Sequence, residues 1–363
     1  MMLPSTATTF DANGRVPFQQ TAKEKKWAET VQSGRIRALM AQLQERRALP
    51  LDEKIEMSLA RIRDWYMAWD GNVSVSYSGG KDSSVLLWLV RCLYPDVPAV
   101  FSHTGLEYPE VVQRVLDTPG HVVLRPRMHF ADVIRVYGWP IASKKIARGV
   151  EVLRNPTPNN KNIYRLYNEG INRFGKKVEG RRVSDCWRFL VHAPFKVSDK
   201  CCGVMKKEPA RRYSRETGRV PFVGLLASDS KDREINYLKH GCNAYDSKEP
   251  KSTPMAFWTE QDVLECIMRY NIPLASVYGG IERDDNGRLR TTGLRRTGCL
   301  FCAFGIHMDY KDGQKTRFEM LKETHPRLWS YVIHRLGLHD VLSYCRTHTS
   351  MPSLARRIRW GEE

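Results

Sequence analysis

The spacing of hydrophobic positions predicts two helices near the start of the chain. Residues Thr21 to Arg47 are highly charged, contain one Gly and no Pro, and favour a helix. After Pro50, hydrophobic side chains recur at helical spacing from Leu51 to Trp69, and Asp70-Gly71 is a stop signal. The polar stretch from Met1 to Gln20 is interpreted as a loose arm.

From residue 73 onward, short strand-like and helix-like segments alternate. Strands are expected at Val73–Ser76, Val97–Phe101, His121–Leu124 and Val220–Leu226, and helices at Ser83–Leu93, Tyr108–Leu116, Phe130–Tyr137 and Thr259–Tyr270. The last of these helices is opened by Thr259-Glu260-Gln261-Asp262, which resembles a capping box. This alternation predicts an α/β fold, with a parallel twisted sheet and helices on both of its faces. Residues 138–182 interrupt the rhythm and are interpreted as a long, basic, partly mobile insertion. Residues 313–347 are expected to be helical.

A phosphate-binding loop is predicted between the first strand and the next helix, with the sequence Ser78-Gly79-Gly80-Lys81-Asp82-Ser83. Two glycines let successive backbone N–H groups point at an anion, and the helix start adds its positive end. The serine hydroxyls can donate hydrogen bonds, Lys81 can neutralise phosphate charge, and Asp82 can partner Mg²⁺ or the helix start. The alternative is an ordinary turn with a capping serine. The pattern is neither a Walker A motif nor a GxGxxG turn.

The predicted elements divide the chain into three regions. We expect an arm and helices over residues 1–70, a nucleotide-binding domain over 71–310, and a helical C-terminal region over 311–363.

Four cysteines form a pattern typical of metal ligands. The adjacent pair Cys201-Cys202 is followed much later by the C-x-x-C pair Cys299 and Cys302. Four thiolates suit a 4Fe–4S cluster or a structural zinc ion, and the spacing differs from that of a zinc ribbon, which favours the cluster. Buried cysteines without a metal are the other alternative. Cys186 is a candidate auxiliary ligand, catalytic thiol or core residue.

The charge distribution predicts a polyanionic partner. The net charge is +18, and the segment from Arg125 to Arg182 holds 14 Lys or Arg against four Asp or Glu, with aromatic residues interleaved. The alternatives are a solvated basic surface, or cations that hold a partner protein or an anionic small substrate. The candidate nucleic-acid contacts are Lys144, Lys145, Arg148, Lys176, Lys177, Arg181 and Arg182.

The chain is expected to be cytoplasmic and not associated with a membrane. No hydrophobic run reaches the length of a membrane span, and the N-terminus lacks a continuous hydrophobic signal core. In that reducing compartment the nine cysteines are not interpreted as a disulfide framework.

Taken together, these motifs resemble the phosphoadenosine phosphosulfate (PAPS) reductase family of PP-loop proteins. Relatives in that group include ATP pyrophosphatases, sulfonucleotide reductases and the sulfur-transfer component of DNA phosphorothioation systems. Residues 78–83 resemble the PP-loop, 103–109 a second segment, and 224–233 a third, nucleotide-contacting segment; 254–263 and 299–305 also fit.

The resemblance implies a PP-loop fold like that of the adenine nucleotide α-hydrolases. It also implies an adenine nucleotide (ATP, or PAPS or adenylyl sulfate) and Mg²⁺, with catalytic roles for Lys81, Asp82 and Ser83. The nucleotide contacts it implies are Ser78, Gly79, Gly80, Lys81, Ser83, His103, Thr104, Gly105, Glu107, Gly224 and Arg233.

The chain also departs from the family pattern. His103 stands where Asp is common, Leu226 replaces the usual Arg, and the Cys-Gly-Leu/Ile-His tail of sulfonucleotide reductases has no counterpart. The first hypothesis is therefore an ATP-binding enzyme that adenylates an acceptor, releases pyrophosphate and supports sulfur transfer or a related modification on nucleic acid. The alternatives are a PAPS or adenylyl-sulfate reductase using Cys345 or Cys186, and a non-catalytic nucleotide-sensing or DNA-binding regulator.

Overall fold

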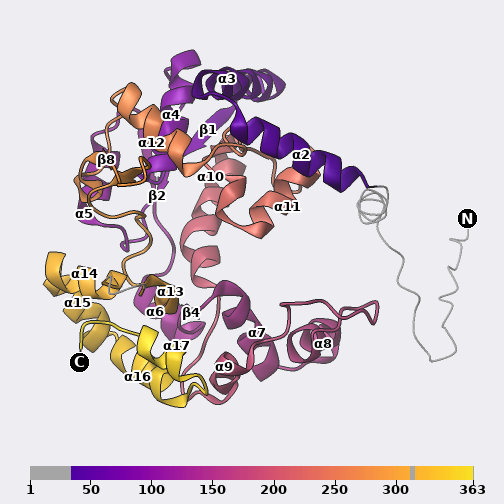
Figure 1. Ribbon diagram of the computed structural model, residues 1–363, viewed down its shortest axis with the longest axis vertical. Coiled ribbons are helices and arrows are strands. Elements are labelled where there is room, and N and C mark those ends of the chain that lie inside the picture. The colour runs from indigo at the N-terminus through magenta and orange to yellow at the C-terminus, as the bar shows by residue number, and fades with distance from the viewer. Residues whose placement is uncertain (1–33, 311–314, 363) are drawn as a thin grey trace, which may run out of the picture.

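A six-stranded sheet of order β3-β2-β1-β5-β7-β6 lies at the centre of the computed structural model, which describes residues 34–310 and 315–362 (Figure 1). Neighbouring strands pair in parallel except β6 with β7. The predicted α/β fold with a mainly parallel sheet is confirmed. The strands are β1 Val73–Ser76, β2 Ala99–Ser102, β3 His121–Leu124, β5 Val220–Val223, β6 Asn243–Ala244 and β7 Lys251–Ser252.

Helices flank this sheet and share one hydrophobic core with it. Helix α3 contributes Ile55, Ile62 and Trp65 to that core, and β1 contributes Val73 and Val75. Buried positions three and four residues apart on α3 give it the hydrophobic face that the sequence predicts. The helices of this part are α2 Arg35–Ala48, α3 Leu51–Ala68, α4 Lys81–Leu93, α5 Pro109–Leu116, α10 Glu208–Thr217, α11 Lys231–His240 and α12 Glu260–Arg269. Helix α6 Phe130–Val136 instead buries Phe130 and Val133 in the second core described below.

Some predicted boundaries are wrong by a few residues, among them the starts of β2 and α4 and the end of β5. Helix α4 begins at Lys81 rather than Ser83, because Gly80 is already extended and serves as its N-cap. Strand β5 ends at Val223 rather than Leu226, because the N–H of Leu225 turns back to donate to the Val223 carbonyl. The part of the first predicted helix before residue 34 lies outside the described residues.

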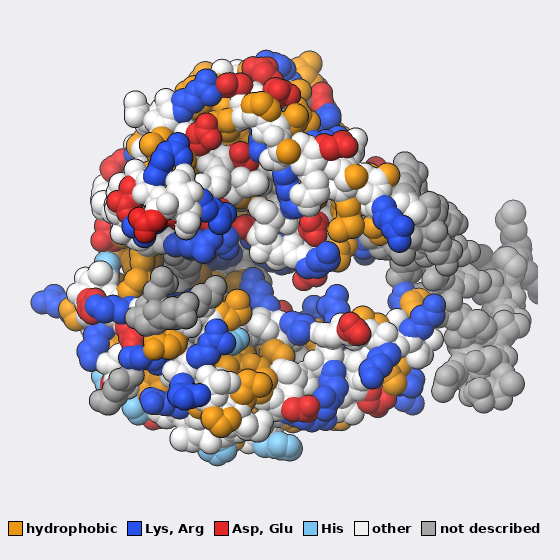
Figure 2. All heavy atoms as spheres, viewed as in Figure 1, with side chains coloured by type: hydrophobic (Ala, Val, Ile, Leu, Met, Phe, Trp, Pro, Cys, Tyr) orange, Lys and Arg blue, Asp and Glu red, His pale blue; other side chains and the backbone are white. Residues whose placement is uncertain are grey.

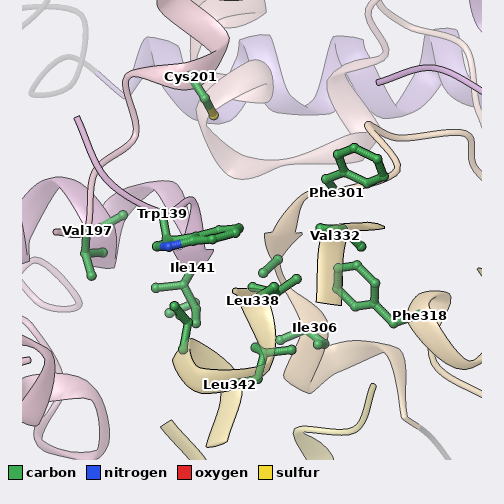
Figure 3. Close-up of a cluster of buried hydrophobic side chains, with 14 of the residues drawn as sticks. Trp139, Ile141, Val197, Cys201, Phe301, Ile306, Phe318, Val332, Leu338 and Leu342 are labelled. Carbon is green, nitrogen blue, oxygen red and sulfur yellow. The ribbon is translucent and has the colours of Figure 1, made fainter. Parts of the chain in front are cut away.

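A second hydrophobic core lies below the sheet in Figure 1, and Figure 3 shows part of it, including Trp139, Phe301 and Leu338. The predicted helical C-terminal region is confirmed and belongs to this core. The elements of this second core, which we call the lower core, are β4 Ile141–Ala142, α7 Lys144–Arg154, α8 Lys161–Glu169, α9 Asp185–Arg188, β10 Ala303–Phe304, α13 Ile306–Asp309, α14 Arg317–Thr324, α15 Pro326–Ser330, α16 Leu338–His348 and α17 Pro352–Arg357.

The interpretation of residues 138–182 as a partly mobile insertion stays a prediction, although the segment has regular secondary structure. These residues form β4, α7 and α8. Helix α7 buries Ile146, Val150 and Leu153, which recur at i, i+4 and i+7 between its basic residues. The segment is therefore an integral part of the lower core, with its basic side chains on the outside.

One continuous helical stretch connects the two cores. It starts at Cys201-Cys202, passes through the π-helical turn Gly203–Lys207, and continues as α10 to pack against β2 and β3 (Figure 1). Single π-helical turns are frequent at functional sites. A short hairpin of β8 Ile281–Arg283 and β9 Leu289–Thr291 completes the described fold. Among the described residues, no helix has the length and hydrophobicity that crossing a membrane requires.

A buried ion pair joins α3 to the start of α12. The Lys54 side chain is 2% exposed, and its Nζ donates to both carboxylate oxygens of Asp262 at 2.8 Å and to the Arg47 carbonyl at 2.7 Å. Asp262 also completes the predicted capping box with Thr259. The pair therefore ties the N-terminal helices to the helix that carries Glu260.

We predict that Lys54→Met lowers the free energy of unfolding by about 3 kcal/mol, because it leaves a buried carboxylate without its cation. Urea unfolding measures the loss. The matched control is Arg61→Met, since Arg61 lies on the same helix in an exposed pair with Asp64. That variant is expected to change the free energy by less than about 0.5 kcal/mol. Equal losses in both variants would contradict the assigned role of Lys54.

Candidate functional site

The loop between β1 and α4 is held closed by serine hydroxyls. Ser83 Oγ accepts from the Ser78 N–H at 3.2 Å, lies 3.0 Å from Ser78 Oγ, and donates to the Gly80 carbonyl at 2.9 Å. Gly79 has φ of +70°, and a Cβ there would lie 2.8 Å from Val111 Cγ1. A glycine is therefore required at this position, and the loop is preorganised around its own backbone.

A cavity of about 430 Å³ opens in front of this loop, and we call it the loop cavity. Gly224 forms part of its wall, and a Cβ there would lie 3.1 Å from the Asp82 carbonyl oxygen. The loop cavity is lined by Ser76, Ser78, Gly80, Lys81, Asp82, Ser83, Lys206, Val223, Gly224, Leu225, Leu226, Asp229, Arg233, Glu260, Tyr278, Arg296 and Thr297.

Lys81 is held by a carboxylate from α12. Its Nζ lies 2.9 Å from Glu260 Oε1, and the other Glu260 oxygen accepts from Arg295 at 2.7 Å. Burial alone would raise the pKa of Glu260, but the hydrogen bonds from Arg295 and Lys81 outweigh it and lower the pKa to about 2. Glu260 is therefore charged at neutral pH, and an incoming phosphate has to compete with it for Lys81.

Asp229 is the centre of a second group of charged side chains in the wall of the loop cavity. Asp229 forms ion pairs with Arg233 and with Arg296, the latter at 2.8 Å. Burial and the nearby Asp229 raise the pKa of the Asp82 carboxyl above its usual range. The Tyr278 hydroxyl lies 2.7 Å from Thr297 Oγ1. This contact fixes the segment that carries Arg295 and Arg296 beside the loop.

The second predicted segment closes on itself. Glu107 accepts from the Thr104 N–H at 3.0 Å and from the Thr104 hydroxyl at 2.7 Å, and His103 Nδ1 lies 3.5 Å from the same carboxylate. Gly105 has φ of +77° within this turn. None of the residues that line the loop cavity, among those the structure describes, comes from 103–107; Thr104 lines a different cavity instead.

That different cavity brings the four predicted cysteines together. Cys201, Cys202, Cys299 and Cys302 all line it, with Thr104, Leu106 and Lys206 among its other walls. We call it the thiol cavity; it measures about 20 Å³. In Figure 3, Cys201 lies at the upper margin of the lower core, above Trp139 and Phe301.

The thiols of this cavity differ in acidity. The hydrogen bond with Cys201 lowers the pKa of the Cys202 thiol against the cost of burial, and Lys144 and Lys206 lower it further. Burial raises the pKa of Cys302 to about 11. Burial would lower the pKa of Lys206, but Cys299 and Glu107 outweigh it and keep the amine charged. The cavity therefore combines thiols with two nearby ammonium groups.

The predicted metal centre itself is not confirmed. Over residues 34–310 and 315–362, no group of three or more His, Cys, Asp or Glu side chains is arranged to hold a metal ion. The cysteine pairs thus converge as the sequence predicts, without forming a site for a single ion.

The seven predicted nucleic-acid contacts are all exposed. They form two neighbouring groups, one on α7 and one in the loop after α8, because the Lys145 ammonium donates to the Gly180 carbonyl. Two others of the seven have partners as well, since Arg182 pairs with Asp185 and Lys144 interacts with Cys202. Figure 2 shows a broad opening between the sheet and the lower core, with Lys and Arg side chains on both margins.

Several residues of the site were missed at the level of sequence. Glu260 was predicted only as part of a capping box. Asp229 lies within the predicted segment 224–233 without being named as a contact, and Arg295 and Arg296 belong to no predicted motif. Lys206 had an available signal, because it follows Cys202 by four residues, a spacing that places two helical residues on one face. It is also the residue that lines both the loop cavity and the thiol cavity.

Comparison with known families fits this geometry. Residues 72–144 and 159–303 match the model of the phosphoadenosine phosphosulfate reductase domain, which is more than half of the chain. The chain belongs to the PAPS reductase domain family. The match includes the phosphate loop, all four cysteines of the thiol cavity and both arginines of the loop cavity wall.

The individual proteins that this chain resembles share little sequence identity with it. Two uncharacterized proteins of Methanocaldococcus jannaschii are 23% and 24% identical over 77% and 79% of this chain, but over 44% and 55% of their own length. The chain thus spans about half the length of these relatives. A PAPS reductase from Candida auris, crystallised with phosphate, overlaps 71% of this chain and 91% of its own at 13% identity and a TM-score of 0.34, which supports no further inference.

We predict that Glu260→Gln tightens pyrophosphate binding to this family member by about fivefold, because one negative charge near the anion is removed, worth about 1 kcal/mol at about 4 Å in water. Isothermal titration calorimetry measures the affinity. Since the pKa of Glu260 is about 2, the gain should not vary between mildly acidic and mildly alkaline pH.

Glu265→Gln is the control, because Glu265 is an exposed residue of the same helix. It should leave the affinity unchanged. Weaker binding in Glu260→Gln would show that Glu260 positions Lys81 for the anion instead of competing with it.

Proposed function

We propose that the chain is a PP-loop enzyme that binds ATP in the loop cavity, adenylates an acceptor with release of pyrophosphate, and supports sulfur transfer at the thiol cavity, with nucleic acid as the acceptor. The observation that carries the proposal is the position of Lys206. This residue lines both cavities, so a group activated in one is adjacent to the thiols of the other.

The residues of the loop cavity fit the first step. An oxygen of the acceptor bonds to the α-phosphorus of ATP, the bond to the bridging oxygen of the β-phosphate breaks, and the acceptor proton leaves to water. Negative charge then develops on the pyrophosphate. Lys81 and the loop N–H groups are placed to stabilise it electrostatically. Asp82 forms no ion pair with any described residue and is the carboxylate that would hold Mg²⁺.

The second step replaces the adenylate by sulfur. A hydrosulfide-equivalent donor forms a bond to the activated carbon of the acceptor, and AMP leaves with the bonding electrons of the carbon–oxygen bond. Neither oxidant nor reductant is consumed. Lys206 is placed between the two cavities to draw the anionic donor toward the leaving AMP.

The donor set of the thiol cavity is the one that a 4Fe–4S cluster takes. Cys201, Cys202, Cys299 and Cys302 supply the four thiolates that such a cluster takes, and Lys144 and Lys206 offset their charge. A cluster is wider than one ion, and a cavity of about 20 Å³ requires the thiols to move apart to hold it. With four protein ligands, the cluster would supply structural and electrostatic support.

The reductase alternative loses one of its two candidate thiols. Cys345 is fully buried in the lower core, and burial raises its pKa to about 12, so it is a neutral thiol and a poor nucleophile. Cys186 is partly buried and lines neither the loop cavity nor the thiol cavity. This favours transfer to an external acceptor over reduction of PAPS by a thiol of this chain.

The basic surface supports nucleic acid as the acceptor. Its α7 group begins at Lys144, which interacts with Cys202, so the row of exposed cations starts at the thiol cavity. A phosphate backbone lying along Lys145, Arg148 and the loop after α8 would therefore place a nucleotide near both cavities.

We predict pyrophosphate release from ATP and Mg²⁺ in the presence of duplex DNA and a sulfide donor, measured by a coupled phosphate assay. Lys81→Ala should reduce the rate by at least about tenfold, because charge on the leaving group loses its cation. Lys161→Ala, an exposed lysine of α8, is the control. Sulfite formed from PAPS and a thiol, without pyrophosphate from ATP, would establish the reductase alternative.

We predict that protein purified without oxygen contains about four irons and four labile sulfides per chain. Cys299→Ser should lower the iron content and the melting temperature, because ligand binding is coupled to folding. Cys242→Ser is the control for the iron content, since Cys242 is buried in the core that the sheet shares with its helices. One zinc per chain and no labile sulfide would contradict the cluster.

We predict that affinity for duplex DNA falls with salt, with a slope of about 0.9 per phosphate contact and about three to six contacts. Replacing Lys176, Lys177 and Arg181 by Ala should flatten the slope and leave stabilisation by ATP unchanged. The control replaces Arg283, Arg288 and Arg290, three exposed arginines of the β8–β9 hairpin. Equal effects of the two triple variants would indicate nonspecific attraction only.

A further inference from the structure

A second large cavity lies on another side of α4, away from the loop cavity. It measures about 390 Å³ and shares no lining residue with the loop cavity. We call it the α4–α5 cavity. Much of its wall is hydrophobic or aromatic: Tyr77, Leu87, Trp88, Pro119, Ile272 and Pro273. Its size and lining are those of small-molecule sites in proteins.

One polar group on its wall is buried without a partner. Ser84 is 4% exposed, and no described residue forms a hydrogen bond with its Oγ. A helical serine usually donates to the carbonyl four residues earlier. Here that carbonyl, on Gly80, already accepts from the Ser84 N–H at 3.0 Å and from Ser83 Oγ at 2.9 Å. With two acceptor sites per carbonyl, the Ser84 hydroxyl is left over on the cavity wall.

A second unpaired donor comes from α5. Arg114 also lines the α4–α5 cavity, and its buried Nε has no hydrogen-bond partner among the described residues. The other cation of the wall, Arg91, donates to the Val97 carbonyl at 3.2 Å. The lining residues include these two arginines and no Asp or Glu, so the cavity favours an anion. Unpaired buried donors are costly, and a ligand that accepts from both gains that energy.

We propose that the α4–α5 cavity binds a small aromatic carboxylate. The carboxylate accepts hydrogen bonds from Arg114 Nε and the Ser84 hydroxyl, while the ring lies against Trp88 and the neighbouring prolines. The two unpaired donors match the two oxygens of a carboxylate. The site is independent of the function proposed above, and it adjoins Ser83 of the phosphate loop through the backbone of α4.

Cys92 provides a local readout, because it is an exposed thiol that lines the same cavity. The full chain is treated with iodoacetamide at mildly alkaline pH, since burial raises the pKa of Cys92, and its alkylation rate is followed by peptide mass spectrometry. Millimolar indoleacetate is expected to slow the alkylation of Cys92, and the neutral analogue indoleacetamide is expected to leave it unchanged. Arg114→Met should weaken this protection by about tenfold, and Arg135→Met, an exposed arginine of α6, should not.

Ser84→Ala gives a second test, whose first readout is the melting temperature without ligand. Removing an unpaired buried hydroxyl should leave the melting temperature unchanged or raise it, while weakening protection by indoleacetate. The matched control is Ser58→Ala, because the buried Ser58 hydroxyl donates to the Pro254 carbonyl and accepts from Trp258, so its loss should lower the melting temperature.

The proposal is overturned if indoleacetate gives no protection, if indoleacetamide protects equally, or if Ser84→Ala destabilises the protein as much as Ser58→Ala. The first result would mean a cavity filled by water or by another segment of a longer protein. The second would mean a hydrophobic pocket without selectivity for an anion. The third would mean that the Ser84 hydroxyl already has a partner.

Discussion

The backbone hydrogen bond from the Leu300 N–H to the Leu106 carbonyl, at 2.7 Å, determines where the second cysteine pair lies. It joins the C-x-x-C turn to the segment after β2. Directly after that turn, β10 pairs in parallel with β4, and the Gly305 N–H donates to the Ala142 carbonyl at 2.7 Å. Three successive backbone attachments thus hold Cys299 and Cys302 against Cys201 and Cys202, although the two pairs are far apart in sequence. The thiol cavity, and with it the position of Lys206 between the two cavities, depends on this pairing.

The sequence predicted what local chemistry determines. The phosphate loop, the helix after it and the capping box at Thr259 follow from glycines, hydroxyls and spacing within a few residues. Each is present as expected, with the helix beginning two residues earlier than predicted. The convergence of the cysteines could also be anticipated, because thiol pairs are rare and few chemistries use them. The charged contacts of the loop cavity could not. The partners of Lys81 and Asp229 come from α12 and from the segment before Cys299, and no local pattern specifies such long-range pairs.

The loop cavity is electrostatically satisfied by its own side chains. Glu260 pairs with both Lys81 and Arg295, and Asp229 pairs with both Arg233 and Arg296, so each carboxylate is shared by two cations. Binding a phosphate there is an exchange of partners and does not fill an empty charged pocket. At equal distance a phosphate with two charges attracts Lys81 about twice as strongly as one carboxylate does, so the exchange favours the ligand. The carboxylates keep the cations in place until that moment, which is the preorganisation that charge stabilisation requires.

Contacts at both ends of the helical stretch that starts at Cys201 fix the position of Lys206. At its beginning, the π-helical turn brings Lys206 back toward the thiols, and Glu107 balances its charge from the segment after β2. At its other end, α10 packs against β2 and β3, so the position of Lys206 is tied to the sheet that carries the phosphate loop. A shift of the sheet relative to the lower core would move Lys206 with respect to both cavities at once. Because packed cores resist gradual deformation, the packing of the whole fold holds the loop cavity and the thiol cavity at a fixed separation.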